Sequence, residues 1–268
     1  MSAPKAAARA AENSQVFRTL ARAGYVVLGI VHIVIGAVAI SIVTSGGGGG
    51  AADQGGAMAQ IRQTPIGVLL LWIIALGLLA LAIWQIVQAF LERNPDAKKK
   101  WGYRLKFVGT AIAYLAIGWT ALVYALGGQS SSSQSSQVFS GQLLATPGGV
   151  FLLVLIGVVV AAIGVSFIVR GATRAFKKHL NLPSGVARPG IVTFGVVGYI
   201  AKGIAIGVTG ILFVVAAFTH DPQKAGGLDA ALRTLATLPF GAVILWVVGA
   251  GLVIYGVYCF ARARYAKM

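Results

Sequence analysis

The sequence has few charged residues, and acidic residues are especially scarce. Only six Asp and Glu stand among 268 residues, against 22 Lys and Arg, and charged residues make up 10% of the chain. Soluble globular domains carry about 25% charged residues. With 57% hydrophobic residues, this composition excludes an ordinary soluble domain and predicts an integral membrane protein.

Residue types that carry chemistry are equally rare. The single cysteine, Cys259, cannot form a disulfide within the chain, and we interpret it as a packing residue. The three histidines lack the spacing of metal or haem ligands, and neither GxxxxGK nor HExxH occurs. None of the six acids falls inside an expected membrane span, whereas ion-coupled carriers usually need one there. We therefore expect no catalytic residue, no metal, no cofactor and no enzymatic activity.

Long uncharged apolar runs are what the sequence does have. A helix needs about 20 such residues to cross a bilayer. Six runs meet this length, at about 22–44, 66–91, 103–127, 148–170, 191–218 and 240–261. They predict an all-α integral membrane protein with six transmembrane helices.

The basic residues gather on one side of this topology. If the helices alternate in direction, 18 of the 22 Lys and Arg fall on the side of the two termini, and only Arg62, Lys224 and Arg233 fall opposite. This asymmetry predicts cytoplasmic termini in a bacterial inner (plasma) membrane. It also accounts for the net charge of +16 through anionic lipid headgroups, so nucleic-acid binding is not expected.

Residues 1–17 form a basic tail without a signal peptide, either an amphipathic helix or a disordered segment.

One stretch occurs three times. It reads TPIGVLLLW at 64–72, TPGGVFLLV at 146–154 and LPFGAVILW at 238–246. In each case a glycine (Gly36, Gly118 or Gly210) precedes the proline by 29 residues. The chain is therefore expected to comprise three tandem two-helix units, at 18–97, 98–182 and 183–268, in a pseudo-threefold arrangement about the membrane normal. Each proline fits the first turn of a helix, with Thr64 and Thr146 as expected N-caps.

The expected outer loops contain low-complexity runs, GGGGG at 46–50 and QSSSSQSSQ at 129–137, which we expect to be flexible and solvated. A short segment then leads to each proline. In the third unit Leu228, Leu232 and Leu235 recur at helical spacing behind a possible Asp229 cap. We expect a short amphipathic helix at the outer interface in each unit, with an ordinary loop as the alternative.

These motifs resemble a known family. RAGYVVLG from Arg22, GYIAKGIAIGVTG at 198–210 and LDAALRTLATLPFG at 228–241, together with the threefold repetition, are similar to the bacterial membrane family called domain of unknown function 1206. The resemblance covers about residues 18–265, and the middle unit is the most divergent. It implies a six-helix inner-membrane protein and implies no activity.

One stripe of the first helix in each unit combines small and large residues. Gly29, His32 and Gly36 align with Ala111, Tyr114 and Gly118, and with Gly203, Ile206 and Gly210. Small residues let helices approach closely in lipid, so this stripe is expected to face the bundle. His32 and Tyr114 are then candidate ligand contacts at mid-membrane depth, or packing residues that find a hydrogen bond.

The remaining candidates lie nearer the basic side. Lys202 could extend to the membrane surface, or it could form a cationic site for an anionic group. Gln88, Arg170 and Arg262 align at the inner ends of the second helices, as membrane-edge anchors or as a ring that binds acidic lipid. Tyr25, Phe107 and Tyr199 are interpreted as an interfacial belt.

Two functions remain from this reading. The first is a non-catalytic membrane component that binds lipids, through anionic headgroups on the cytoplasmic side, or a partner protein. The alternative is a channel or uncoupled transporter of small or apolar solutes along the bundle axis. Gly203-xxx-Gly207 could also serve self-association, which leaves a homo-oligomer or a protein partner open.

Overall fold

The computed structural model describes residues 15–45, 50–92, 95–183, 185 and 187–267. The main helices, in chain order, are α2 (Gln15–Thr44), α3 (Gln54–Arg62), α4 (Gly67–Leu91), α5 (Ala97–Ala125), α6 (Ser132–Leu144), α7 (Gly149–Ala172), α8 (Ala187–Thr219), α9 (Gly227–Thr237) and α10 (Gly241–Tyr265). Two short 3-10 helices, η1 (Ala175–His179) and η2 (Pro222–Ala225), lie in loops. Residues 1–14 of the predicted tail lie outside this range, and residues 15–17 belong to α2.

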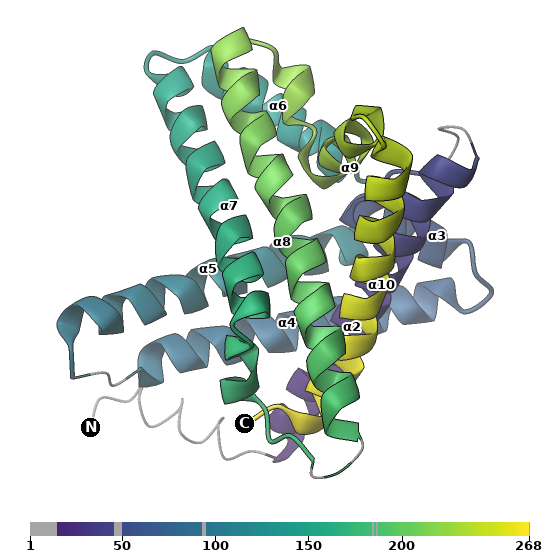
Figure 1. Ribbon diagram of the computed structural model, residues 1–268, viewed down its shortest axis with the longest axis vertical. Coiled ribbons are helices and arrows are strands. Elements are labelled where there is room, and N and C mark those ends of the chain that lie inside the picture. The colour runs from purple at the N-terminus through teal and green to yellow at the C-terminus, as the bar shows by residue number, and fades with distance from the viewer. Residues whose placement is uncertain (1–14, 46–49, 93–94, 184, 186, 268) are drawn as a thin grey trace.

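Six helices are long and apolar enough to cross a membrane, as the sequence predicts. They are α2, α4, α5, α7, α8 and α10, and each lies close to its expected run. The start of α2 and the end of α10 lie at the same end of the molecule (Figure 1). We call this end the basic end, and we call the opposite end, with α3, α6 and α9, the outer end.

The three repeats pack in a head-to-tail cycle. The first membrane helix of each repeat lies against the second membrane helix of the repeat before it, which makes the close antiparallel pairs α4/α5, α7/α8 and α2/α10. The last pair joins the third repeat back to the first. The three interfaces between repeats are therefore of one kind, each built from helices of neighbouring units.

Glycine at the stripe explains why these pairs form. A Cβ added to Gly36 of α2 would lie 2.5 Å from the carbonyl oxygen of Gly249 on α10, so only glycine fits. In α7/α8, a Cβ at Gly210 would lie 2.6 Å from the carbonyl oxygen of Gly157. The third pair is looser, because a Cβ at Gly118 of α5 would first meet Leu78 of α4, at 3.4 Å. The stripe therefore holds neighbouring repeats together within one chain, including Gly203, where a Cβ would lie 2.7 Å from the carbonyl oxygen of Gly164.

The pattern has one gap. Within repeats 1 and 3 the two membrane helices also pack on each other, as α2/α4 and α8/α10. The equivalent helices of repeat 2, α5 and α7, do not pack against each other in the part of the chain that the structure describes. In Figure 1, α4 and α5 run across the direction of α7 and α8.

The short outer helices are confirmed as α3, α6 and α9, but some details of the sequence reading are wrong. α6 begins at Ser132, so most of the serine run is helical and capped by the Ser131 hydroxyl. Thr64 and Thr146 do not cap α4 and α7. Their hydroxyls donate to the carbonyl oxygens of Ile61 and Leu143, and so satisfy the ends of the preceding short helices.

Acidic residues connect the outer helices. Asp229 lies in the first turn of α9 and is not its cap. Its carboxylate accepts from the Ala52 amide at 2.7 Å and pairs with Arg233 at 2.9 Å. The buried Asp53 caps α3 and accepts from the Ser133 hydroxyl of α6 at 2.9 Å. Since the Ala52–Asp229 and Ser133–Asp53 bonds join segments of different repeats, polar contacts connect the repeats at the outer end.

Two glycines of α8 provide a matched test of the packing. Gly210→Ala would press a methyl group against the α7 backbone, whereas a methyl group at Gly207 would meet nothing within 4 Å. We expect Gly210→Ala to lower the free energy of unfolding by about 1–3 kcal/mol, as overpacking does. Gly207→Ala should leave stability unchanged or raise it by about 1 kcal/mol, through helix propensity. Thermal unfolding in detergent measures both, and equal stability of the two variants would contradict the close approach of α7 and α8.

Candidate functional site

Aromatic side chains fill the interior near the basic end. Tyr199 of α8 stacks on Phe176 of η1, with ring centroids 5.2 Å apart, and meets Tyr255 and Tyr258 of α10 edge-on at 5.5 and 5.7 Å. Each of these four rings is at most 4% exposed. Gly198 of α8 makes room for the cluster, because a Cβ there would lie 2.6 Å from the Cα of Tyr255.

Lys202 lies against these rings. Its ammonium group is 4.4 Å from the Tyr255 ring centroid and 5.2 Å from that of Phe167 on α7. It also donates a long hydrogen bond, at 3.4 Å, to the Tyr255 hydroxyl. Lys202 is therefore placed between α7, α8 and α10, where aromatic faces attract the cation.

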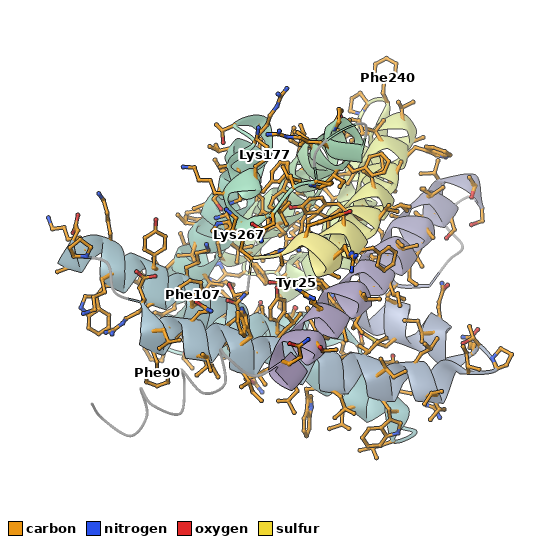
Figure 2. All side chains as sticks on the ribbon, turned by 90° about the horizontal axis from the view of Figure 1, so that it is seen from below. Tyr25, Phe90, Phe107, Lys177, Phe240 and Lys267 are labelled. Atoms are coloured by element: carbon orange, nitrogen blue, oxygen red, sulfur yellow. The ribbon has the colours of Figure 1, made fainter. Side chains whose placement is uncertain are left out.

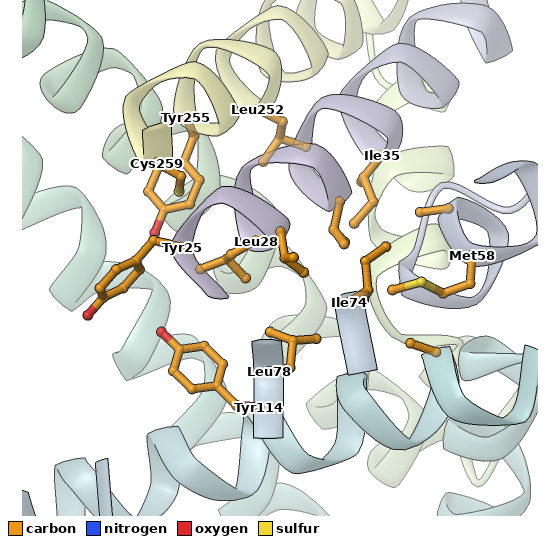
Figure 3. Packing of buried hydrophobic residues seen from close by; sticks show 14 of the residues in the cluster. Tyr25, Leu28, Ile35, Met58, Ile74, Leu78, Tyr114, Leu252, Tyr255 and Cys259 are labelled. Atoms are coloured by element: carbon orange, nitrogen blue, oxygen red, sulfur yellow. The ribbon is translucent and has the colours of Figure 1, made fainter. Parts of the chain in front are cut away.

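Arg262 of α10 also lies against an aromatic ring. Its guanidinium lies 4.4 Å from the ring centroid of Tyr25 on α2. Figure 3 shows Tyr25 and Tyr114 with their hydroxyl groups directed to the same side of the packed cluster.

More cations lie at the same end. Arg170 of α7 is 5.9 Å from the Phe167 ring centroid, and it interacts electrostatically with Lys106 of α5, as does Arg262. We call Lys106, Arg170, Lys202 and Arg262, with the rings they contact, the cation–aromatic cluster. None of the ion pairs found between described residues includes any of these four cations. Glu92 is the one acid whose electrostatic effect on Lys106 is found.

The pKa of His179 reflects the positive potential of this region. Burial and the nearby charges of Lys106, Arg262, Arg170 and Lys267 lower the pKa of His179 from 6.5 to about 4. Backbone bonds fix its segment, since the His179 carbonyl accepts from the Lys267 amide at 3.1 Å and Asn181 donates to Tyr265 at 2.8 Å. Figure 2 views the molecule from this end and labels Lys177, Lys267, Tyr25 and Phe107.

The predicted site residues have different surroundings. His32 is buried, its Nδ1 lies 2.8 Å from the Leu28 carbonyl oxygen, and its ring centroid is 4.8 Å from that of Tyr255. It adjoins the cation–aromatic cluster and interacts electrostatically with Lys202. Tyr114 is buried as well, and its hydroxyl group is directed to the same side as that of Tyr25 (Figure 3). Gln88 is half-buried on α4, and no hydrogen bond of its side chain is found with a described residue.

The sequence reading missed the aromatic residues of the cluster. Tyr25 and Tyr199 were expected in an interfacial belt, but they are 5% and 4% exposed and lie inside. An aromatic residue near a helix end has the same sequence pattern whether it faces lipid or a neighbouring helix, so the belt prediction was wrong for these two residues. The usable signal was Tyr255 and Tyr258, which share one face of a helix that also carries Arg262.

His179 gives a pH-dependent prediction. Its folded pKa lies below the unfolded value of 6.5, so the unfolded chain binds more protons between pH 4 and 6.5. The contribution of His179 to stability is therefore complete above about pH 6.5 and is lost as the pH falls toward 4. We expect thermal stability to fall more steeply over this range in the parent protein than in His179→Gln. Identical pH profiles would show that the cations do not act on His179.

Comparisons with known proteins agree with the repeat. The family model described as Domain of Unknown Function (DUF1206) matches the chain three times, at residues 23–92, 105–174 and 197–266. A relative from Bacillus subtilis (strain 168), described as uncharacterized protein YxxB, is 30% identical over 261 residues, which is 96% of this chain and 94% of the relative. No solved structure matches the chain.

Proposed function

Since the chain belongs to the family of the Domain of Unknown Function (DUF1206), whose description names no activity, we propose a function from the structure. The protein is a non-catalytic component of the bacterial plasma membrane, with both termini in the cytoplasm, that binds the anionic headgroup of a lipid at the cation–aromatic cluster. One observation carries this proposal: four cations from repeats 2 and 3 converge at the basic end, and none of them has an ion-pair partner among the described residues.

The physical argument is charge compensation. Positive side chains that approach one another near a membrane repel, and the surrounding rings offset only part of this cost. A lipid phosphate supplies the missing negative charge, and basic sites between helices are a known way to bind such headgroups. Arginine suits this role because its planar guanidinium can donate two parallel hydrogen bonds to a phosphate. Arg170 and Arg262 would bind the phosphate, with Lys106 and Lys202 beside it.

A lipid titration tests the proposal. Phosphatidylglycerol added to the detergent-purified protein should raise its melting temperature, and phosphatidylcholine should not. At about 100 times the dissociation constant a ligand adds about 2.7 kcal/mol, and one kcal/mol corresponds to about 2–4 °C for a chain of this size. We therefore expect a rise of about 5–10 °C.

Variants locate the effect. The double variant Arg170→Gln, Arg262→Gln should lose the rise caused by phosphatidylglycerol. Arg264→Gln removes an exposed cation from the same helix as Arg262 and serves as the matched control, which should keep the rise. A rise that persists in the double variant, or that vanishes in the control as well, would refute binding at the cluster.

Packing at the level of His32 supports a closed bundle over the alternative of a conduit. The His32 side chain is packed on Tyr255, and the helices of this layer meet at glycines. In a Cys259→Ser background, His32→Cys and Tyr114→Cys should resist a membrane-impermeant thiol reagent added from either side. Ser135→Cys, at an exposed outer position, should react and serve as the control. Labelling at both buried positions would favour a water-filled path instead.

A further inference from the structure

The gap in the cycle of repeats lies between α5 and α7, and it leaves both helices with a wide apolar surface. On α5, Gly109 and Ala113 are exposed, whereas their counterparts on α2, Val27 and Val31, are 2% and 1% exposed. On α7, Val159 and Ile163 are 50% and 43% exposed. The equivalent helices of the other two repeats cover each other at this place. We call the region between α5 and α7 the open side.

Cations stand at the basic end of the open side. Lys106 of α5 and Arg170 of α7 interact electrostatically although their helices do not pack, and Arg262 of α10 interacts with Lys106 as well. Further along α5, Gly109 and Ala113 share a side of the helix with Lys106 by their spacing. Both are exposed, and a Cβ at Gly109 would meet nothing within 4 Å. Each helix thus combines a basic residue near one end with uncovered apolar surface beyond it.

We propose that the open side holds the acyl chains of the same anionic phospholipid whose headgroup the cation–aromatic cluster binds. This inference rests on the proposed function and adds where the rest of the lipid lies. The bound lipid would take the place that direct contact between the two membrane helices has in repeats 1 and 3. The chains would lie along α5 and α7, below the level of Lys106 and Arg170.

Charge decides in favour of a lipid over a protein occupant. A transmembrane helix or a second copy of this chain would have to place an acidic side chain near Lys106 and Arg170, which is costly at that depth. This chain has only six acids, and none of the five described ones lies within the apolar part of a membrane helix. A phospholipid carries its phosphate at the membrane edge already and presents apolar chains to the helices beneath it.

The test separates binding of the acyl chains from binding of the headgroup. Ala113→Trp and Ile163→Trp each fill part of the open side, and Val247→Trp adds the same ring to a 64% exposed position of α10 as the matched control. The probes are dioleoyl phosphatidylglycerol and the short-chain dihexanoyl phosphatidylglycerol, titrated in detergent and followed by native mass spectrometry. We expect each open-side variant to bind the dioleoyl lipid at least about tenfold more weakly. Their affinity for the short-chain lipid, and the affinity of the control for both, should match the parent protein.

A second measurement does not depend on the tryptophan variants. Phosphatidylglycerol with a diazirine on its acyl chain, at one lipid per protein, should crosslink on illumination mainly to peptides of α5 and α7. This preference should disappear in Arg170→Gln, Arg262→Gln. Crosslinks spread evenly over all six membrane helices of the parent protein would overturn the inference even if a tryptophan variant failed to fold.

The outcomes distinguish the two proposals. One outcome would be unchanged affinity for the dioleoyl lipid in both tryptophan variants, with lipid affinity lost in the arginine double variant. This outcome would contradict acyl-chain binding at the open side but would agree with headgroup binding at the cluster. Unchanged affinity in the arginine double variant would refute the headgroup site and, with it, this inference. A stable dimer that forms only when the open side is unmodified would identify a second copy of the chain as the occupant and overturn the lipid.

Discussion

The rest of the structure depends on the close approach of antiparallel helices at glycine. In a membrane there is little hydrophobic gain from bringing helices together, so association depends on van der Waals contact and on backbones that can come near. Gly36 with Gly249, and Gly210 with Gly157, provide that contact at two of the three junctions between repeats. Because each junction joins different repeats, these contacts bring the basic ends of distant helices together and so create the cation–aromatic cluster.

The chain handles positive charge in an unusual way. Most buried cations in proteins are paired with acids, whereas Lys202 and Arg262 face aromatic rings at 4.4 Å. Two of the acids that the structure describes lie at the outer end, where Asp53 and Asp229 hold the outer helices together. Aromatic rings attract a cation without neutralising it, so the basic end keeps a positive potential.

The middle repeat departs from the other two in both sequence and structure. Where repeats 1 and 3 have Gly29 and Gly203, it has Ala111, and Gly118 on α5 makes a looser contact than its counterparts. Within the residues that the structure describes, its own two membrane helices do not pack on each other. The divergence that weakens the repeat pattern in the sequence therefore coincides with the open side, and the same region carries Lys106 and Arg170. In the described part of the chain, the imperfect repeat therefore leaves α5 and α7 uncovered by each other, unlike the equivalent helices of repeats 1 and 3.

The sequence by itself determined the number of membrane helices, the threefold repeat, the short outer helices and the side on which the basic residues lie. These features follow from local properties: the length of apolar runs, the spacing of glycine and proline, and the sign of loop charge. Only the tertiary structure decided which helices and side chains contact one another. Tyr25 and Tyr199 read as belt residues because burial between helices cannot be told from exposure to lipid when both surroundings are apolar. The same ambiguity hid the open side, since the exposed face of α5 is as apolar as any lipid-facing helix.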